Sequence, residues 1–204
     1  MNTVRVFLCG DVMTGRGVDQ ILPHPSDPRI YEPSLRDARA YVRVAEAVNG
    51  PIPRSVEYAY IWGDALSELE RASPAARIVN LETSVARSDA YWPKGINYRM
   101  HPANVPCLTA AGIEVCALAN NHILDYGPAG LVETLETLHG AGLGTAGAGR
   151  NLDEARRPAV VDLANGRLFV FSVGAASSGI PPSWAATAQE PGVDFVGKLS
   201  DAAS

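Results

Sequence analysis

Three short polar segments hold the residues of this chain that could carry out chemistry. Each follows an apolar run, and together they contain Asp11, Asn80, Glu82, Asn120, Asn121, His122 and Asp125. Carboxylate oxygens, amide oxygens and an imidazole nitrogen are suitable ligands for Mn²⁺, Fe, Mg²⁺ or Zn²⁺. Acidic residues at the ends of separate strands can hold a metal, which generates hydroxide near neutral pH and stabilises an attacked phosphoryl or carbonyl oxygen. These residue types therefore favour metal-assisted hydrolysis.

The apolar runs before these segments are typical of buried β-strands. They cover residues 4–8, 77–81 and 112–116. The third polar segment leads to Pro128 and then to leucines at helical spacing, which predicts a strand, a polar turn and a helix. Because ligand sites of α/β sheets lie at the carboxyl ends of parallel strands, we expect the three segments to meet.

A structural role is the alternative for each position taken alone. Asp11 and Asn120 could simply cap the helices that follow them, since Asp and Asn are both favoured at helix N-termini. The occurrence of three such strand ends in one chain favours a shared functional site over three separate caps.

Among the histidines, His122 is the residue that the sequence favours for proton transfer. Asp125 follows three residues later and could orient the imidazole ring or raise its pKa toward neutral pH. An ordinary turn residue is the alternative. His24, in a proline-rich segment, and His101, before a proline, are interpreted as surface residues whose loops could still reach a pocket. His139 lies late in a predicted helix, where an imidazolium favours the helix dipole, and receives no catalytic role.

Alternating strands and helices predict an α/β protein with a mostly parallel core sheet and one antiparallel hairpin. Apolar spacing predicts helices over residues 35–48, 61–72, 104–111 and 131–139. Asn165-Gly166, between apolar residues 158–163 and 168–173, predicts the hairpin. We expect a single domain over residues 1–204, with an insertion at about residues 19–72 that lies over the sheet edge or over the pocket.

Composition and the remaining motifs argue against several other functions. A net charge of −5 over 204 residues gives no basic footprint for a nucleic acid. Residues 142–147 fit GxGxxG, but a helix precedes them, so we interpret them as a glycine-rich helix exit and not as a dinucleotide site. Ser177 lacks the context of a serine nucleophile. With no signal-peptide core and no run of about 18 apolar residues, we expect a soluble, cytoplasmic chain without a membrane span.

Four segments together resemble the capsule-synthesis CapA family, the poly-γ-glutamate capsule proteins. They are residues 9–13 (CGDVM), 79–83 (VNLET), 119–127 (ANNHILDYG) and 147–151 (GAGRN). The resemblance extends from residue 4 to about residue 196. The order and spacing of the four segments make it specific, and ANNHxxDxG is the strongest of them.

The resemblance implies a metallophosphatase-like α/β/β/α sandwich of four layers, with a metal site at its strand ends. By analogy with the Gly-Asn-His-Glu/Asp motif of calcineurin-like metallophosphatases, Asn121 would be a metal ligand and His122 the proton donor. Asp11 would be the first metal carboxylate and Glu82 the bridging acid. By the same analogy, Asn80 and Asn120 would lie behind the metal ligands and support them.

The chain also departs from the metallophosphatase pattern. Met13 occupies the place of the histidine in the Asp-x-His motif, and residues 80–82 (NLE) replace the Gly-Asp of the second motif. No histidine follows His139, although such proteins carry further ligand histidines in a second half. We therefore expect the N-terminal part of a domain that is incomplete at its C-terminus, cannot hold two metals and is inactive alone.

These observations predict a CapA-like protein of capsule or poly-γ-glutamate biosynthesis that acts, in its complete form, as a metal-dependent hydrolase on an amide or phosphoester. The expected cofactor is a divalent metal ion (Mn, Fe, Zn or Mg), with up to two in the full-length protein. The expected partners are an anionic polymer or a phosphorylated small substrate, together with capsule-synthesis machinery. The alternative is a non-enzymatic subunit that binds an anionic polymer or assists a capsule synthase.

Overall fold

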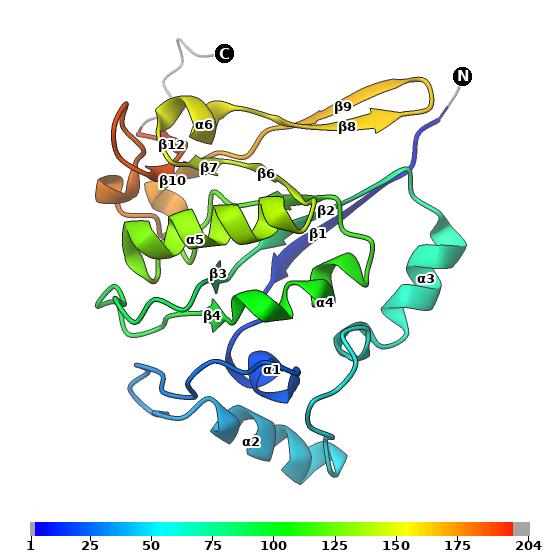
Figure 1. Cartoon of the computed structure of the whole chain (residues 1–204), viewed down its shortest axis with the longest axis vertical. Coiled ribbons are helices and arrows are strands. Elements are labelled where there is room, and N and C mark those ends of the chain that lie inside the picture. Colours follow the sequence, from blue (N-terminus) through cyan, green and yellow to red (C-terminus); the bar gives the residue numbers. More distant parts are fainter. Residues whose placement is uncertain (1–2, 198–204) are drawn as a thin grey trace.

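A four-stranded parallel β-sheet forms the centre of the molecule (Figure 1). The computed structural model describes residues 3–197. The sheet has the order β1-β2-β5-β6 and consists of β1 (Val6–Val12), β2 (Ala76–Leu81), β5 (Val115–Ala117) and β6 (Gly144–Ala146). All neighbouring strands run parallel. The predicted α/β class with a parallel core sheet is therefore confirmed.

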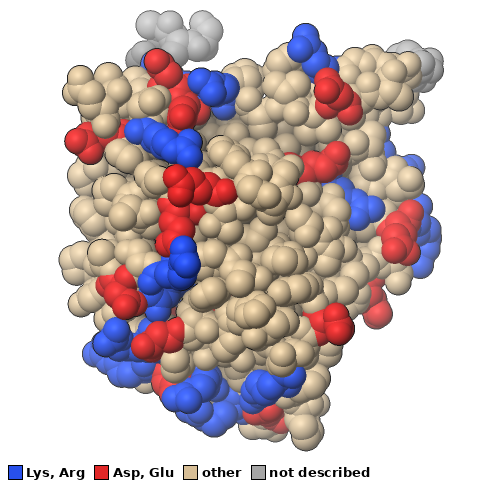
Figure 2. Space-filling view, viewed as in Figure 1, with Lys and Arg blue, Asp and Glu red and all other residues tan. Residues whose placement is uncertain are grey.

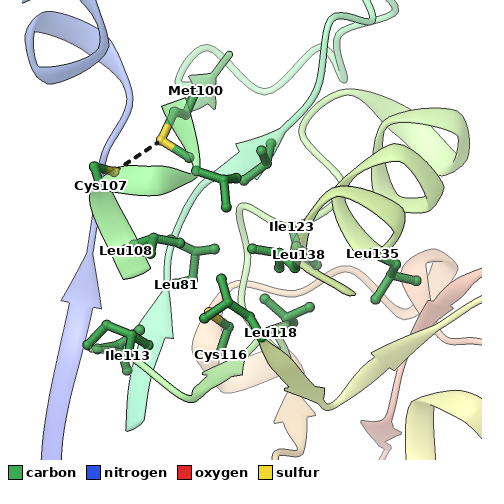
Figure 3. Close-up of a cluster of buried hydrophobic side chains, with 14 of the residues drawn as sticks. Leu81, Met100, Cys107, Leu108, Ile113, Cys116, Leu118, Ile123, Leu135 and Leu138 are labelled. Carbon is green, nitrogen blue, oxygen red and sulfur yellow. Dashed lines mark hydrogen bonds between the residues drawn. The ribbon is translucent and has the colours of Figure 1, made fainter. Parts of the chain in front are cut away.

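One face of the sheet is covered by helices. α5 (Gly127–Gly140) begins with Pro128 in its first turn, and α4 (Pro106–Thr109) packs beside it. Helical spacing places the leucines of α5 in one stripe that faces the sheet. The buried cluster between helices and sheet (Figure 3) includes Leu81, Cys107, Leu108, Cys116, Leu118, Leu135 and Leu138. This cluster is the main hydrophobic core.

The other face is covered by an antiparallel hairpin of β8 (Ala159–Leu163) and β9 (Gly166–Val170). Successive side chains of a strand point to opposite faces, so the sheet residues on this side alternate with those of the main core. They form a smaller buried cluster of Ala76, Ile78, Val115, Ala146, Ala159 and Val161. The predicted hairpin is confirmed, although Leu163 pairs with Gly166 and the turn residues are Ala164 and Asn165.

The segment between β1 and β2 contains α1 (Arg16–Ile21), α2 (Arg39–Asn49) and α3 (Ala65–Ala72). In Figure 1, α1 and α2 lie beyond the carboxyl end of β1, and α1 packs against α2. The helix expected over residues 61–72 is split into a 3-10 turn, Tyr60–Trp62, and α3. Gly63 has φ +50° between them, a left-handed conformation that ends the first turn.

The remaining elements are short. They comprise β3 (Ser84–Val85), β4 (Arg99–Met100), β7 (Ala148–Gly149), α6 (Leu152–Arg156), β10 (Gly174–Ala175), β11 (Gly192–Val193), β12 (Phe195–Val196) and 3-10 turns at Pro102–Asn104, Ala176–Ser178 and Pro182–Trp184. The strands pair as β3-β4, β7-β11 and β10-β12. The helix expected over residues 104–111 appears as the turn Pro102–Asn104 followed by α4.

The glycine-rich segment after α5 contains a strand that the sequence did not reveal. Residues 142–147 were interpreted as a helix exit, yet Gly144–Ala146 form β6 and pair with β5. A Cβ at position 144 would meet the Ala159 Cβ and the Glu114 carbonyl at 3.4 Å, an ordinary van der Waals contact, so β6 lies directly against the hairpin. The segment therefore continues the central sheet after α5.

Charged side chains of both signs are mixed on the face shown in Figure 2, and none of one sign dominates that view. This distribution agrees with the modest net charge of −5. Over the described part of the chain, the helices all fall short of the length and apolarity needed to cross a bilayer.

Candidate active site

The carboxyl ends of β1, β2 and β5 surround a hollow of about 400 Å³. It is lined by Asp11, Asn80, Glu82, Ala117, Ala119, Asn120, Asn121, Ser172, Val173 and Ser178. All three polar segments singled out from the sequence thus reach one place. A second hollow, of about 670 Å³, lies at the amino ends of β1 and β2, and its lining contains no acidic residue and no histidine.

Asp11 occupies a strained position at the end of β1. Its φ is +56°, a left-handed conformation that costs a non-glycine residue energy. The β1–β2 register shifts between Cys9 and Val12, so a bulge turns Asp11 out of the regular ladder. Strain of this kind persists only where the surroundings fix it, and here it directs a carboxylate into the hollow.

Two asparagine side chains connect Asp11 to the loop after β5. Asn120 Nδ2 donates to Asn80 Oδ1 at 3.0 Å, and Asn80 Nδ2 donates to Asp11 Oδ1 at 2.8 Å. Asn120 Nδ2 also donates to the Leu81 carbonyl, and its Oδ1 accepts the His122 backbone N–H at 3.0 Å. Both amides are occupied by protein partners, so they position Asp11 and the backbone of His122.

Glu82 lies next to Asp11 at the end of β2. Partial burial and, secondly, the charge of Asp11 raise the pKa of the Glu82 carboxyl above its ordinary value, and a nearby His122 opposes this shift. Two acidic groups held close together at a concave surface are therefore a source of repulsion. A proton or a cation between them would relieve it.

His122 is buried, with 6% of its surface exposed, and lies between two carboxylates. Its Nδ1 is 2.7 Å from Asp125 Oδ2, and its Nε2 is 3.5 Å from Glu82 Oε1. Asp125 is fully buried and also accepts the Tyr98 backbone N–H at 2.7 Å. A carboxylate at Nδ1 favours the proton on that nitrogen and leaves Nε2 facing Glu82, which lines the hollow, whereas His122 itself lies outside that lining.

Lys94 is a component of the site that sequence reasoning missed. Its Nζ lies 2.6 Å from Asp125 Oδ1 and 3.2 Å from His122 Nδ1, and it donates to the Asn121 backbone carbonyl. The ammonium therefore neutralises the buried carboxylate that orients the imidazole. Lys94 lies in the irregular segment before β4, where no spacing pattern indicates its partners.

A stack of planar groups supports the outer side of His122. The Tyr98 ring lies on the imidazole, with centroids 3.9 Å apart and planes at 19°, and the Arg16 guanidinium lies 4.6 Å from the Tyr98 centroid. Arg16 Nε is paired with Glu32 Oε1 at 2.6 Å. Burial raises the pKa of the Tyr98 hydroxyl, which keeps it protonated. Arg16 and Glu32, from the segment between β1 and β2, thus support the Tyr98 ring that lies on His122.

The other residues singled out in the sequence take different positions. Asn121 lines the hollow, and its side chain lies beside Gly179, whose φ of +77° favours a glycine. His24 and His101 face each other with ring centroids 6.4 Å apart and are outside the lining of the hollow. His139 Nε2 lies 2.8 Å from Thr145 Oγ1, also away from the site.

The donors at the hollow suit one hard divalent cation. Asp11 and Glu82 carry carboxylate oxygens and Asn121 an amide oxygen, which are ligands that Mg²⁺ and Mn²⁺ prefer, whereas the Ser178 hydroxyl is already hydrogen-bonded to Ala175. Among residues 3–197, His, Cys, Asp and Glu side chains form no group of three arranged to hold an ion. Neutral oxygens and water would therefore complete the coordination. These residues fit a single cation and lack the ligands of a metal pair.

The family model described as Bacterial capsule synthesis protein PGA_cap matches residues 5–202. The chain belongs to this family. Two relatives from two strains of Mycobacterium tuberculosis, each named a probable polyglutamine synthesis accessory protein, are 52% identical over 194 residues. The alignment covers 94% of this chain and 51% of each relative, so the chain spans about half the length of these curated relatives. The resemblance to capsule-synthesis proteins is confirmed.

The four segments that carried the resemblance now have positions in a PGA_cap structure. Residues 9–13, 79–83 and 119–127 lie at the ends of β1, β2 and β5 and border the hollow. Residues 147–151 lie elsewhere, around β7, where the Asn151 side chain caps α6 by accepting the Glu154 backbone N–H at 2.9 Å. Three of the four segments therefore surround the candidate site, and the fourth has a structural position.

Proposed function

We propose that this PGA_cap-family chain contains the hydrolytic centre of a capsule or polyglutamate biosynthesis protein, acting with a divalent metal ion on an amide or phosphoester. The observation that supports this most strongly is the position of His122 between two carboxylates. Asp125 is 2.7 Å from one ring nitrogen and Glu82 is 3.5 Å from the other. A buried imidazole with one nitrogen fixed by a carboxylate and the other facing Glu82, which lines the hollow, is suited to general acid–base catalysis.

Each residue of the centre has a role that follows from its contacts. Asp125 fixes the tautomer and orientation of His122, and Lys94 balances the negative charge of Asp125. His122 donates the Nε2 proton to the leaving nitrogen or oxygen of the substrate. Tyr98 stacks on the ring and limits water on that side, which strengthens the electrostatic contacts of the imidazole.

The oxygens of Asp11, Glu82 and Asn121 would hold the cation. When bound, it would supply charge stabilisation at the attacked phosphoryl or carbonyl group and relieve the repulsion between Asp11 and Glu82. Asn80 and Asn120 would keep the Asp11 carboxylate directed at this position through the hydrogen bonds described above.

Cation binding gives the first test. Calorimetric titration of the chain with Mn²⁺ should show one site, and the double variant Asp11→Asn, Glu82→Gln should weaken it at least about tenfold, since two charged ligands become neutral. The double variant Asp162→Asn, Glu190→Gln removes the same charges from exposed positions and should bind like the wild type. Equal binding by both double variants would disprove the assignment of Asp11 and Glu82.

Proton transfer gives the second test. His122→Ala should retain Mn²⁺ binding. In the longer Mycobacterium tuberculosis relative, alanine at the aligned histidine should lower hydrolysis of γ-glutamyl p-nitroanilide, whose leaving nitrogen must be protonated, by about 10²–10⁴, the usual contribution of a positioned acid–base group. Unchanged turnover would remove His122 from the mechanism.

The word accessory in the names of the relatives favours a second candidate function. In it, the same hollow binds an anionic polymer, or the chain is a non-enzymatic subunit of capsule-synthesis machinery. The two candidates differ in their observables. Absence of Mn²⁺ binding and of hydrolysis by the longer relative, together with binding of poly-γ-glutamate, would support the accessory role over the hydrolase.

A further inference from the structure

Ser172 lines the hollow but has no role in the hydrolytic centre described so far. It is half-buried and lies between β9 and β10. Its hydroxyl oxygen accepts the backbone N–H of Ala119 at 3.3 Å, and within residues 3–197 its own O–H donates to no protein acceptor. A serine hydroxyl has one proton to donate and two lone pairs that accept. The proton is therefore what Ser172 can offer to a molecule in the hollow.

Ser178, the second serine of the same lining, differs in this respect. Its hydroxyl donates to the Ala175 carbonyl at 2.8 Å and accepts the Ala175 backbone N–H at 3.2 Å. The donor and one acceptor position of this hydroxyl are thus both used inside one 3-10 turn. Of the two hydroxyl groups at the hollow, the one on Ser172 is available as a donor.

Gly147 fixes the position of the Ser172 side chain. A Cβ at position 147 would lie 2.6 Å from the Ser172 Cβ and 2.7 Å from its Oγ, closer than two side chains can pack. The serine therefore rests directly on the backbone of a residue that has no side chain, and the φ of +91° at Gly147 also favours glycine. Gly147 begins the segment 147–151 (GAGRN), so this segment contributes to the hollow through Ser172.

Gly174 fixes the chain two residues beyond Ser172. Its N–H donates to the Asp194 carbonyl at 2.9 Å, and a Cβ at position 174 would lie 3.1 Å from the Ala119 carbonyl. Ser172 and Gly174 thus both lie against Ala119, the residue before Asn120. The Ser172 hydroxyl is therefore held against the loop that follows β5, and a donor held in place in advance needs no reorganisation when a substrate binds.

We propose that Ser172 is a substrate-positioning residue that donates its hydroxyl proton to a phosphoryl or acyl oxygen of the molecule in the hollow. This rests on the proposed function, because it takes the hollow as the place of the substrate. When ionised, Asp11 and Glu82 accept hydrogen bonds but cannot donate them, so they offer nothing to a substrate oxygen directly. A neutral donor in the same lining gives that oxygen a partner and favours substrates that present an acceptor there.

Calorimetric titration of the Mn²⁺-loaded chain tests the role of Ser172. The probes are phenylphosphonate, which presents phosphoryl oxygens, and glutamine, the simplest γ-glutamyl amide. Ser172→Ala should weaken the binding of at least one probe about threefold to tenfold, the usual effect of losing one hydrogen bond. The weakened probe identifies the class of oxygen that is bound. Ser178→Ala, in the same lining, is the matched control and should bind both probes like the wild type.

Mn²⁺ affinity separates this role from a structural one. Ser172→Ala should keep the wild-type affinity for Mn²⁺, because the loop after β5 that carries Asn121 stays in place. A parallel loss of Mn²⁺ affinity would overturn the proposal and make Ser172 a support of the loop or a ligand of the cation. If Ser172→Ala does not fold, Ser172→Cys, which has a weaker donor, replaces it.

Two further outcomes would overturn the proposal. One is wild-type affinity of Ser172→Ala for both probes, and the other is the absence of binding of either probe to the wild-type chain. Failure of the wild-type chain to bind Mn²⁺ would contradict the proposed function without contradicting the role of Ser172. The hydroxyl does not depend on the cation, so the same comparison of Ser172→Ala with Ser178→Ala in the metal-free chain then decides it.

Discussion

The two faces of the central sheet differ in how completely they are covered. On the helix-covered face Leu118, Leu135 and Leu138 are at most 1% exposed. On the hairpin-covered face the buried cluster has six residues, while Leu8 and Phe171 remain mostly exposed. Helices bring long side chains to the first face, whereas the hairpin brings alanine and valine to the second. The loop that carries His122 is anchored in the larger core through Ile123 and Leu124, whereas part of the hairpin-covered side stays exposed.

Truncation in the main core should have the largest effect on stability. Leu135→Ala should lower the free energy of unfolding by about 2–5 kcal/mol, since it leaves a cavity among fully buried groups. Val160→Ala, at a half-exposed position on β8, should change the free energy of unfolding by about 0.5 kcal/mol or less. Denaturant titration measures both. Similar losses at the two positions would contradict the proposed difference between the faces.

Neutralising the buried carboxylate behind His122 should have the next largest effect. Asp125→Asn should destabilise the protein by about 1–3 kcal/mol, because the new amide group would have to face Lys94 or the His122 ring. Asp162→Asn on the hairpin, at an exposed position, should be close to neutral. Thermal unfolding compares the two. A neutral Asp125→Asn would show that the loop does not depend on this contact.

The pH dependence at the sheet ends should be smaller. Burial and the charge of Asp11 raise the pKa of Glu82, so the folded state holds this proton more tightly than the unfolded chain. That contribution to stability is fully present below the unfolded-state pKa of about 4.3 and is lost as the pH rises through the higher folded-state value. Glu82→Gln should therefore be more stable than the wild type at neutral pH. Melting curves across this range should converge on the acidic side, and a variant less stable at neutral pH would reverse the sign.

The smallest effect on stability is expected at Phe171, an exposed aromatic residue that directly follows β9. Phe171→Ser should change the free energy of unfolding by about 0.5 kcal/mol or less while raising the solubility of the chain, since it reduces an uncovered apolar surface. Turbidity on concentration and denaturant titration measure the two properties. A large loss of stability would show that Phe171 already packs within the chain. Val48→Ser is the control, because Val48 is exposed on α2 and far in the sequence from the β8–β9 hairpin.

The fold and the positions of the acidic and imidazole groups could be predicted because they depend on local patterns. Apolar runs located the ends of β1, β2 and β5, and the rule for parallel sheets then brought Asp11, Glu82 and His122 together. The helical spacing of leucines located α5 to within a few residues. The roles of these residues and the metal ion remain predictions.

The rest depends on contacts between irregular segments. Lys94 and Tyr98 reach the site from a stretch whose sequence has no period, and each meets a residue of the distant loop after β5. Arg16, which has a left-handed φ of +50°, contacts the Tyr98 ring, and no sequence motif predicts this contact. The strand β6 could not be predicted because glycines usually weaken strands, and its pairing with β5 is a contact that the local pattern does not encode.

The direction of the hydrogen bonds between Asn120, Asn80 and Asp11 has a further consequence. The NH₂ group of Asn120 donates to the Asn80 oxygen, and the NH₂ group of Asn80 donates to Asp11. The Asn120 oxygen accepts the backbone N–H of His122. Because an aspartate in either place would turn a donor into an acceptor, chemical deamidation at Asn80 would set two anions against each other. Exchange of the Asn80 amide for an acid would thus remove the hydrogen bond that fixes the Asp11 carboxylate at the end of β1.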